Sequence, residues 1–189
     1  MRKMKNVGKE SVLTVPNMLS LFRLGLVPVF VRLYLRENTA AALAVLLLSG
    51  LTDVLDGYIA RRFHRVSDLG KILDPVADKL TQAVTLVCLA GRFPAMLLPL
   101  SILFIKELSS AVLCVMAIRK SGQVCSSDWH GKLCTVCLYG MICLHLLLPD
   151  MPVGLSAIWV GICCGTMLFS FVMYASAHLG VILRQKKKS

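Results

Sequence analysis

Charged residues are scarce in this chain. Asp, Glu, Lys and Arg make up 16% of its 189 residues, whereas apolar residues make up 57%. An ordinary soluble domain has about 25% charged residues, so this composition excludes one. Several uncharged stretches, of which 151–183 is the longest, can cross a bilayer. We therefore predict an all-α integral membrane protein.

Acidic residues are the scarcer kind of charge, ten against 21 Lys and Arg, which leaves a formal net charge of +11. The basic clusters contain no interleaved aromatic residues and no nucleic-acid motif, so no nucleic-acid partner is expected. Most basic side chains lie near the two ends of the chain and in the connections after the second and fourth apolar segments. By the positive-inside rule, both termini and these connections are predicted to be cytoplasmic.

A cleaved secretory signal is not expected either, because the first apolar segment carries Arg23 and Arg32 and has no small-residue cleavage site. Zinc is not expected, since Cys134 and Cys137 form a single CxxC with no second pair and no nearby histidine pair. Most other cysteines lie inside apolar segments, where we expect them to pack as small apolar side chains. The histidines at positions 145 and 178 are expected to be hydrogen-bonded core residues.

What is present is a succession of apolar segments that predicts six transmembrane helices. Their ranges are 16–35, 39–62, 70–90, 94–118, about 132–148 and 153–183. Residues 1–14 are polar and basic and are predicted to be a cytoplasmic juxtamembrane segment, either a short helix on the membrane surface or a frayed tail. The six helices form one domain over 15–184, and 185–189 are a basic cytoplasmic tail.

Five of the ten acidic residues lie within 53–78. Asp53 and Asp56 are three residues apart and Asp74 and Asp78 are four apart, so each pair lies on one face of its helix. Because the two helices are antiparallel neighbours, the pairs are expected to meet at the cytoplasmic face. Four carboxylates at one depth repel each other unless cations neutralise them, which favours Mg²⁺ and a diphosphate ligand. Asp68 fits neither pair.

Three groups of charged residues outside these pairs are also candidates. Arg61 provides a fixed positive charge for the same phosphates. Arg23, two turns into the first helix, is either a functional residue or an inter-helix hydrogen-bond donor. Lys106 and Glu107 either neutralise each other or line the polar cavity of the carboxylates.

Eight residues match every fixed position of D-x2-D-G-x2-A-R-x8-G-x3-D-x3-D, the signature of the CDP-alcohol phosphatidyltransferases. They are Asp53, Asp56, Gly57, Ala60, Arg61, Gly70, Asp74 and Asp78. The chain therefore resembles this family. Pro16-Asn17 with Arg23, the segment 129–132 followed by Thr135, and the length are most similar to the bacterial phosphatidylglycerolphosphate synthases.

The resemblance implies a reaction and a set of roles. The phosphatidyl group of CDP-diacylglycerol passes to glycerol 3-phosphate, giving phosphatidylglycerol phosphate and CMP, in a homodimer in the bacterial cytoplasmic membrane with cytoplasmic active sites. Two Mg²⁺ or Mn²⁺ ions are held by the four motif aspartates, with Asp78 also acting as general base. Cytidine and diphosphate are bound by Gly57, Ala60 and Arg61, together with Asn17 and Gly70.

The acceptor alcohol stays open. Glycerol 3-phosphate needs cations beyond Arg61, for which Arg119, Lys132 and Arg23 are the candidates, unless the first two are ordinary positive-inside charges. The synthases typically have Arg-Glu where this chain has Lys106-Glu107, and lysine lacks the bidentate geometry of arginine. Phosphatidylglycerol, as in the cardiolipin synthases that share the segment 74–78, inositol phosphate and serine are therefore alternatives.

Two readings outside this family are weaker. Intramembrane prenyltransferases also bind a diphosphate through Asp pairs, but they are longer and lack the spacing from Ala60-Arg61 to Gly70. A divalent-cation channel or carrier would need acidic residues at more than one depth, whereas the outer turns hold only Glu37 and Asp150.

Overall fold

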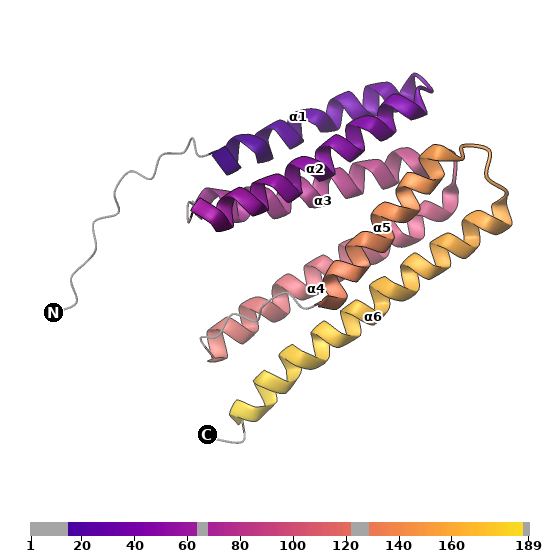
Figure 1. The fold of residues 1–189 in the computed structure, drawn as a ribbon. Helices are drawn as coiled ribbons and strands as arrows, with labels where there is room; N and C mark the ends of the chain where they lie inside the picture. Colours follow the sequence, from indigo (N-terminus) through magenta and orange to yellow (C-terminus); the bar gives the residue numbers. More distant parts are fainter. Residues whose placement is uncertain (1–14, 64–67, 122–128, 187–189) are drawn as a thin grey trace. The chain divides into compact units, whose positions relative to one another are not determined.

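The computed structural model describes the backbone of residues 15–63, 68–121 and 129–186, and all of its regular structure is helical (Figure 1). There are six α-helices and one short 3₁₀ helix in these ranges. They are α1 (Val15–Leu35), α2 (Thr39–Phe63), α3 (Asp68–Ala90), η1 (Pro94–Met96), α4 (Leu97–Ser121), α5 (Trp129–Leu147) and α6 (Val153–Lys186). The predicted all-α architecture with six long helices is confirmed.

Several helix ends differ from the prediction by two or three residues. Asp68 begins α3, two residues before Gly70, where a loop was expected, and an acidic residue in a first turn is favoured by the helix dipole. The segment 94–96 is a 3₁₀ turn instead of the start of α4, and α6 continues to Lys186. The predicted juxtamembrane segment 1–14 lies outside the described residues.

The composition of the helices is that of a multi-pass membrane protein. Four helical segments in the described part of the chain are long and apolar enough to cross a bilayer: Met18–Leu35, Pro94–Val112, Trp129–Leu147 and Val153–Ser176. In the described part of α2, the apolar stretch Thr39–Asp53 is shorter than these four. Large apolar side chains such as Ile105 and Val153 are exposed, as lipid-facing residues are. Six membrane spans remain a prediction.

The chain divides into two compact units, residues 1–84 and 85–189. In the first unit α1 and α2 pack as an antiparallel hairpin (Figure 1). Its turn places Glu37 in the left-handed region with φ of 59°, and the amide of Asn38 donates to the Leu33 carbonyl at 3.1 Å. The Asn38 side chain accepts from the Ala41 amide at 3.1 Å and so caps α2. The expected turn at 36–38 is confirmed.

In the second unit α6 packs against both α4 and α5. His145 on α5 is buried and contacts the Met141 carbonyl through Nδ1 at 2.8 Å and the Ser156 hydroxyl through Nε2 at 2.9 Å. The Phe93 ring meets it edge-on, with centroids 4.9 Å apart. His145 is therefore the satisfied core histidine that was predicted. The side chain of His178 is not among those described.

The cysteines of the second unit pack as expected from their apolar neighbourhoods. Cys134, Cys163 and Cys164 are buried free thiols. The Cys163 thiol lies 4.0 Å from the Met167 sulfur. These side chains fill core space together with the apolar residues of α5 and α6.

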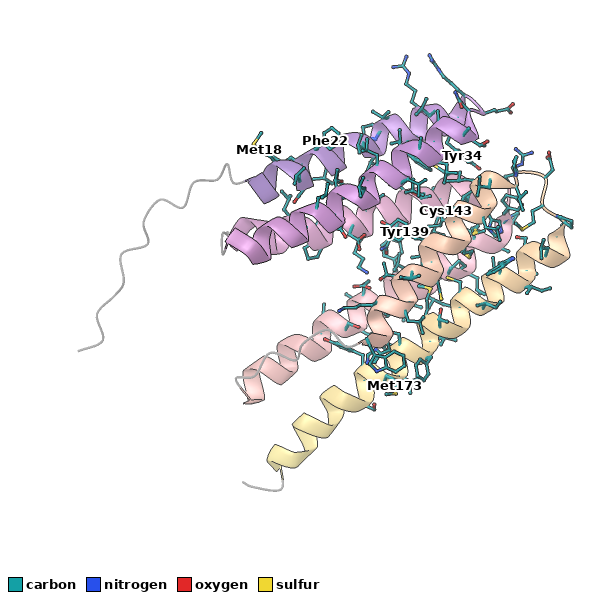
Figure 2. All side chains as sticks on the ribbon, in the orientation of Figure 1. Met18, Phe22, Tyr34, Tyr139, Cys143 and Met173 are labelled. Atoms are coloured by element: carbon teal, nitrogen blue, oxygen red, sulfur yellow. The ribbon has the colours of Figure 1, made fainter. Side chains whose placement is uncertain are left out.

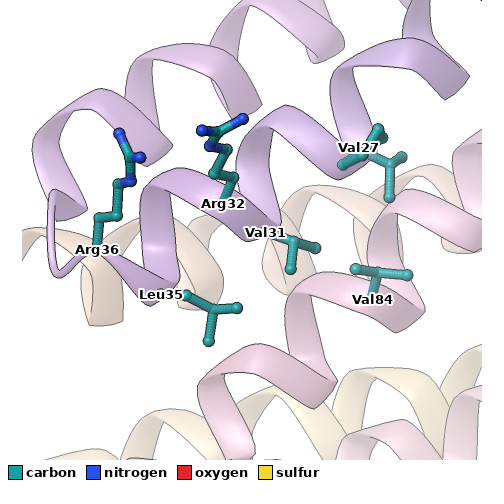
Figure 3. Close-up of a pocket in the computed structure, with 7 residues that line it drawn as sticks. Val27, Val31, Arg32, Leu35, Arg36 and Val84 are labelled. Atoms are coloured by element: carbon teal, nitrogen blue, oxygen red, sulfur yellow. The ribbon is translucent and has the colours of Figure 1, made fainter.

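The first unit has an open groove beside α1, with a volume of about 600 Å³ (Figure 3). Apolar side chains form most of its lining, among them Val31 and Leu35 of α1 and Val84 of α3. Arg32 and Arg36 lie at its edge. None of the motif carboxylates whose side chains are described lines it.

Candidate functional site

The N-terminal half of α1 has two buried polar side chains on one face. Ser20 and Arg23, one helical turn apart, are 0% and 1% exposed. The opposite face is apolar and exposed, with Met18 and Phe22 on it, and Figure 2 shows Met18 projecting from α1 away from α2. In this part of α1 the pattern is the reverse of that of a soluble protein: Ser20 and Arg23 point inward, to other helices.

Arg23 makes an ion pair with the first aspartate of the motif. Its Nη1 lies 2.5 Å from Oδ1 of Asp53 on α2, and the Asp53 side chain is 48% exposed. The residues Ala42, Leu46 and Ser49 are buried on the same stripe of α2, and this stripe carries Asp53 toward α1. A buried guanidinium is stable in such surroundings only when it is paired, so the inter-helix contact that was one of the two expectations for Arg23 is present.

Ser20 donates a hydrogen bond to Oδ1 of Asp74 on α3. Asp74 is followed by Pro75, which has no backbone N–H. The backbone carbonyl four residues before Pro75 therefore lacks the N–H donor that it would have in a regular helix. Helix α1 thus contacts both helices of the motif, α2 through Arg23 and α3 through Ser20.

Asp78 has a partner on its own helix. The Gln82 Nε2 donates to Oδ2 of Asp78 at 3.0 Å, four residues further along α3. Gln82 is 1% exposed, so its amide cannot turn to solvent. This contact fixes the orientation of the Asp78 carboxylate, the group that was predicted to take a proton.

A divalent cation was predicted to bind the four motif aspartates. Among the side chains that the structure describes, no three His, Cys, Asp or Glu residues come close enough together to hold a metal. The side chain of Asp56 is not among them. The donors that are described, Asp53, Asp74 and Asp78, are all carboxylates, the hard oxygen ligands that suit Mg²⁺ or Mn²⁺, and Asp53 is open to a further ligand.

The residues predicted to bind the nucleotide and the diphosphate lie on α1, α2 and α3. The backbones of Gly57, Ala60 and Arg61 continue α2, Gly70 lies in the first turn of α3 and Asn17 in that of α1. The side chains at these positions lie outside the described set, and so does that of Arg119. Lys132, in the first turn of α5, is exposed.

Lys106 and Glu107 of α4 pair with each other. The Lys106 Nζ lies 3.2 Å from Oε1 of Glu107, and the side chains are 14% and 36% exposed. The expectation that these two charges neutralise each other is confirmed.

Two residues of the site were not singled out from the sequence, Ser20 and Gln82. Each lies one helical turn from a residue that was: Ser20 three residues before Arg23, and Gln82 four residues after Asp78. Helical spacing from a candidate charge is the signal that could have found them. The spacing alone does not show that Ser20 contacts another helix or that Gln82 contacts Asp78 on its own helix.

The comparisons with known proteins agree with the family resemblance of the motif over 53–78. A family model described as CDP-alcohol phosphatidyltransferase matches residues 13–181. A cardiolipin synthase (CMP-forming) of Streptomyces coelicolor is 43% identical over 124 residues, 61% of this chain and 56% of that protein. The match thus spans just over half the length of that relative.

Relatives of a second kind match over most of their length. The CDP-diacylglycerol–glycerol-3-phosphate 3-phosphatidyltransferase of Yersinia pestis is 33% identical over 152 residues, 77% of this chain and 83% of that protein. The protein of the same name from Blochmanniella floridana is 28% identical over 185 residues, 94% of this chain and 97% of that protein.

Proposed function

Because this chain belongs to the CDP-alcohol phosphatidyltransferase family, we propose that it transfers the phosphatidyl group of CDP-diacylglycerol to glycerol 3-phosphate. The products are phosphatidylglycerol phosphate and CMP. The observation that carries this proposal is the complete family signature over 53–78, in a chain whose end-to-end relatives carry the name of this activity.

The motif aspartates Asp53, Asp56, Asp74 and Asp78 would hold the divalent cations, Mg²⁺ or Mn²⁺ and two per site. Carboxylates suit these ions, and the contacts of Asp53, Asp74 and Asp78 each leave lone pairs for another ligand. When bound, such cations neutralise the diphosphate and the charge on the departing CMP.

The chain's own residues then have separate tasks. Asp78 takes the proton of the acceptor hydroxyl, and Gln82 keeps its carboxylate in one orientation. The hydroxyl oxygen bonds to the phosphorus that carries diacylglycerol, and the bond from that phosphorus to the bridging oxygen breaks, so CMP leaves with the electron pair. Arg61 binds the diphosphate, and the small residues Gly57 and Ala60 let the cytidine end approach. Asn17 and Gly70 complete this binding region.

The phosphate of glycerol 3-phosphate is separate from the diphosphate of the donor, and it needs cations of its own. We assign it to Arg119 and Lys132, and the exposure of Lys132 suits a group that meets a water-soluble acceptor. Arg23 is the third candidate from the sequence, but its ion pair with Asp53 favours another role.

A second acceptor, phosphatidylglycerol, is favoured by two observations. The relative from Streptomyces coelicolor, at 43% identity, is named a cardiolipin synthase. Lys106 also stands where the glycerolphosphate enzymes have arginine, and it is paired with Glu107. Transfer to phosphatidylglycerol would use the same carboxylates and the same departing CMP.

We further propose that the protein is a homodimer of the bacterial cytoplasmic membrane, with both termini and the site in the cytoplasm. The arrangement of Lys and Arg along the chain supports this orientation. Cysteine-accessibility labelling of single cysteines placed at residues 5 and 187 in sealed cells tests it. Labelling from outside the cell would contradict it.

The acceptor is tested with the purified chain in detergent, given CDP-diacylglycerol, Mg²⁺ and one acceptor at a time. We expect CMP release with glycerol 3-phosphate and a lipid product that contains its phosphate. CMP release with phosphatidylglycerol alone would establish the second candidate. No CMP with glycerol 3-phosphate, phosphatidylglycerol, inositol phosphate or serine would rule out the whole proposal.

A further inference from the structure

The family signature begins at Asp53, yet two of its carboxylates are held by residues far upstream on α1. Arg23 Nη1 is 2.5 Å from Oδ1 of Asp53, and Ser20 donates to Oδ1 of Asp74. The two contacts go to different helices, α2 and α3. A single turn of α1 therefore connects the first aspartate of one pair with the first aspartate of the other.

We propose that Ser20 and Arg23 are positioning residues that hold the carboxylates of Asp74 and Asp53 where a divalent cation binds them. The proposal rests on the proposed function, since it takes these aspartates as metal ligands. Both side chains are at most 1% exposed, so neither can leave its carboxylate for solvent. Asp78 is held differently, by Gln82 of its own helix.

Each contact can orient a carboxylate and still leave it free to bind a cation. A carboxylate can accept about four hydrogen bonds, so one contact on Oδ1 orients the group and leaves it able to bind a cation. Hydrogen bonds of this kind to metal ligands commonly change metal affinity roughly 10- to 100-fold when they are removed. Asp53, at 48% exposed, needs such a contact because nothing else described holds its side chain.

The proposal gives Arg23 a different role from that of an acceptor-binding residue. An arginine that binds the acceptor phosphate sets the KM for glycerol 3-phosphate. A positioning arginine sets the affinity for the metal and leaves that KM unchanged. Arg23→Lys separates the two roles, because it keeps the charge near the site but loses the rigid fork of the guanidinium.

The experiment measures Mn²⁺ binding to the full-length purified chain in detergent, without substrate, from the electron paramagnetic resonance of free Mn²⁺. We expect Ser20→Ala and Arg23→Lys each to raise the dissociation constant roughly tenfold or more. Ser20→Thr keeps the hydroxyl and should restore most of the affinity. At saturating metal, the KM for glycerol 3-phosphate of Arg23→Lys should stay within about twofold.

Matched controls exist in the same unit. Ser49 is a buried serine of α2 whose hydroxyl has no hydrogen-bond partner in the described part of the chain, so Ser49→Ala should leave the affinity unchanged. Arg32→Gln changes an exposed arginine of α1 and should also be neutral. Circular dichroism and gel filtration check folding, and Ser20→Cys replaces Ser20→Ala if the latter does not fold.

The outcomes distinguish this proposal from the function on which it rests. If the unsubstituted chain binds Mn²⁺ and releases CMP, but Ser20→Ala binds Mn²⁺ as tightly as Ser49→Ala, the positioning role is wrong and the function stands. If Mn²⁺ binding depends on Ser20 while no acceptor gives CMP, the positioning role stands and the function is wrong. A chain that binds no Mn²⁺ overturns the positioning role. A higher KM for Arg23→Lys with unchanged Mn²⁺ binding overturns the role of Arg23.

Discussion

The two units of the chain have interiors of opposite character. Among the described residues, the buried side chains of unit 1–84 are four apolar and six polar, whereas those of unit 85–189 are fifteen apolar and five polar. The first interior contains Arg23, Ser20 and Gln82, which all contact motif carboxylates. The second contains leucine, methionine and cysteine, with His145 fully hydrogen-bonded. The contrast separates an interior whose polar residues contact the motif carboxylates from one that is mostly apolar packing.

Asp78→Asn is expected to have the largest effect, because it removes a carboxylate that the first interior contacts without changing the shape of the side chain. Asparagine can still accept from Gln82, but it cannot take a proton. We expect CMP release to fall roughly 100- to 10,000-fold, as for loss of a general base. Binding of CDP-diacylglycerol should be partly retained.

The matched control for Asp78→Asn is Asp150→Asn. Asp150 is an exposed aspartate in the turn before α6, in unit 85–189. Its substitution should leave turnover within about twofold. Turnover of Asp78→Asn within tenfold of the unsubstituted chain would show that Asp78 is not the base.

His145→Leu tests the other interior. It removes two hydrogen bonds and leaves the Ser156 hydroxyl buried without a donor or acceptor, which costs about 2 kcal/mol. The melting temperature in detergent should fall, while CMP release per folded molecule stays the same. Ser156→Ala removes only one of the hydrogen bonds and should cost about 1 kcal/mol. A loss of activity without a loss of stability would place His145 in the chemistry instead.

Glu37→Gly should stabilise the first unit slightly. Glu37 has φ of 59°, a conformation that glycine adopts without strain, and the gain is about 0.5–1 kcal/mol. Thermal unfolding of the variant in detergent measures it. Arg36→Gly, one residue earlier and not in the left-handed region, should destabilise or have no effect. Equal effects of the two variants would contradict the backbone explanation.

The smallest effect is expected from Arg92→Gln. The Arg92 Nη2 lies 2.7 Å from Oδ1 of Asp150, but the two side chains are 47% and 90% exposed. Such surface pairs contribute between 0 and about 1 kcal/mol, so neither the melting temperature nor the turnover should change measurably. A clear loss of stability would show that unit 85–189 depends on polar contacts more than its interior suggests.

Helix number and most helix ends could be predicted, because apolar runs bounded by Pro, Gly and charged turns are local features of the sequence. The 3₁₀ turn at 94–96 could not, since proline is equally favourable at the start of an α-helix. The start of α3 at Asp68 was missed because the polar residues before Gly70 are typical of a loop.

The candidate site could be predicted in its charges but not in its contacts. The spacing of Asp53, Asp74 and Asp78 places each on a helix face, yet it does not give the distance between helices. Ser20 has no charge, so only its helical spacing from Arg23 pointed to it, and that spacing does not show its contact with Asp74. The pairing of Lys106 with Glu107 was one of two alternatives predicted from the sequence. It could be predicted because the two opposite charges are neighbours in an apolar helix.

The ion pair of Arg23 also has a consequence for the biosynthesis of the protein. An arginine at the centre of a transmembrane helix adds up to about 2.5–3.5 kcal/mol to the cost of inserting it into the bilayer, and Arg23, two turns into α1, adds part of this cost. The partner of Arg23, Asp53, is synthesised 30 residues later, in the second half of α2. Helix α1 therefore enters the membrane at a disadvantage that the arrival of α2 reduces, so the first two helices are expected to insert as a pair.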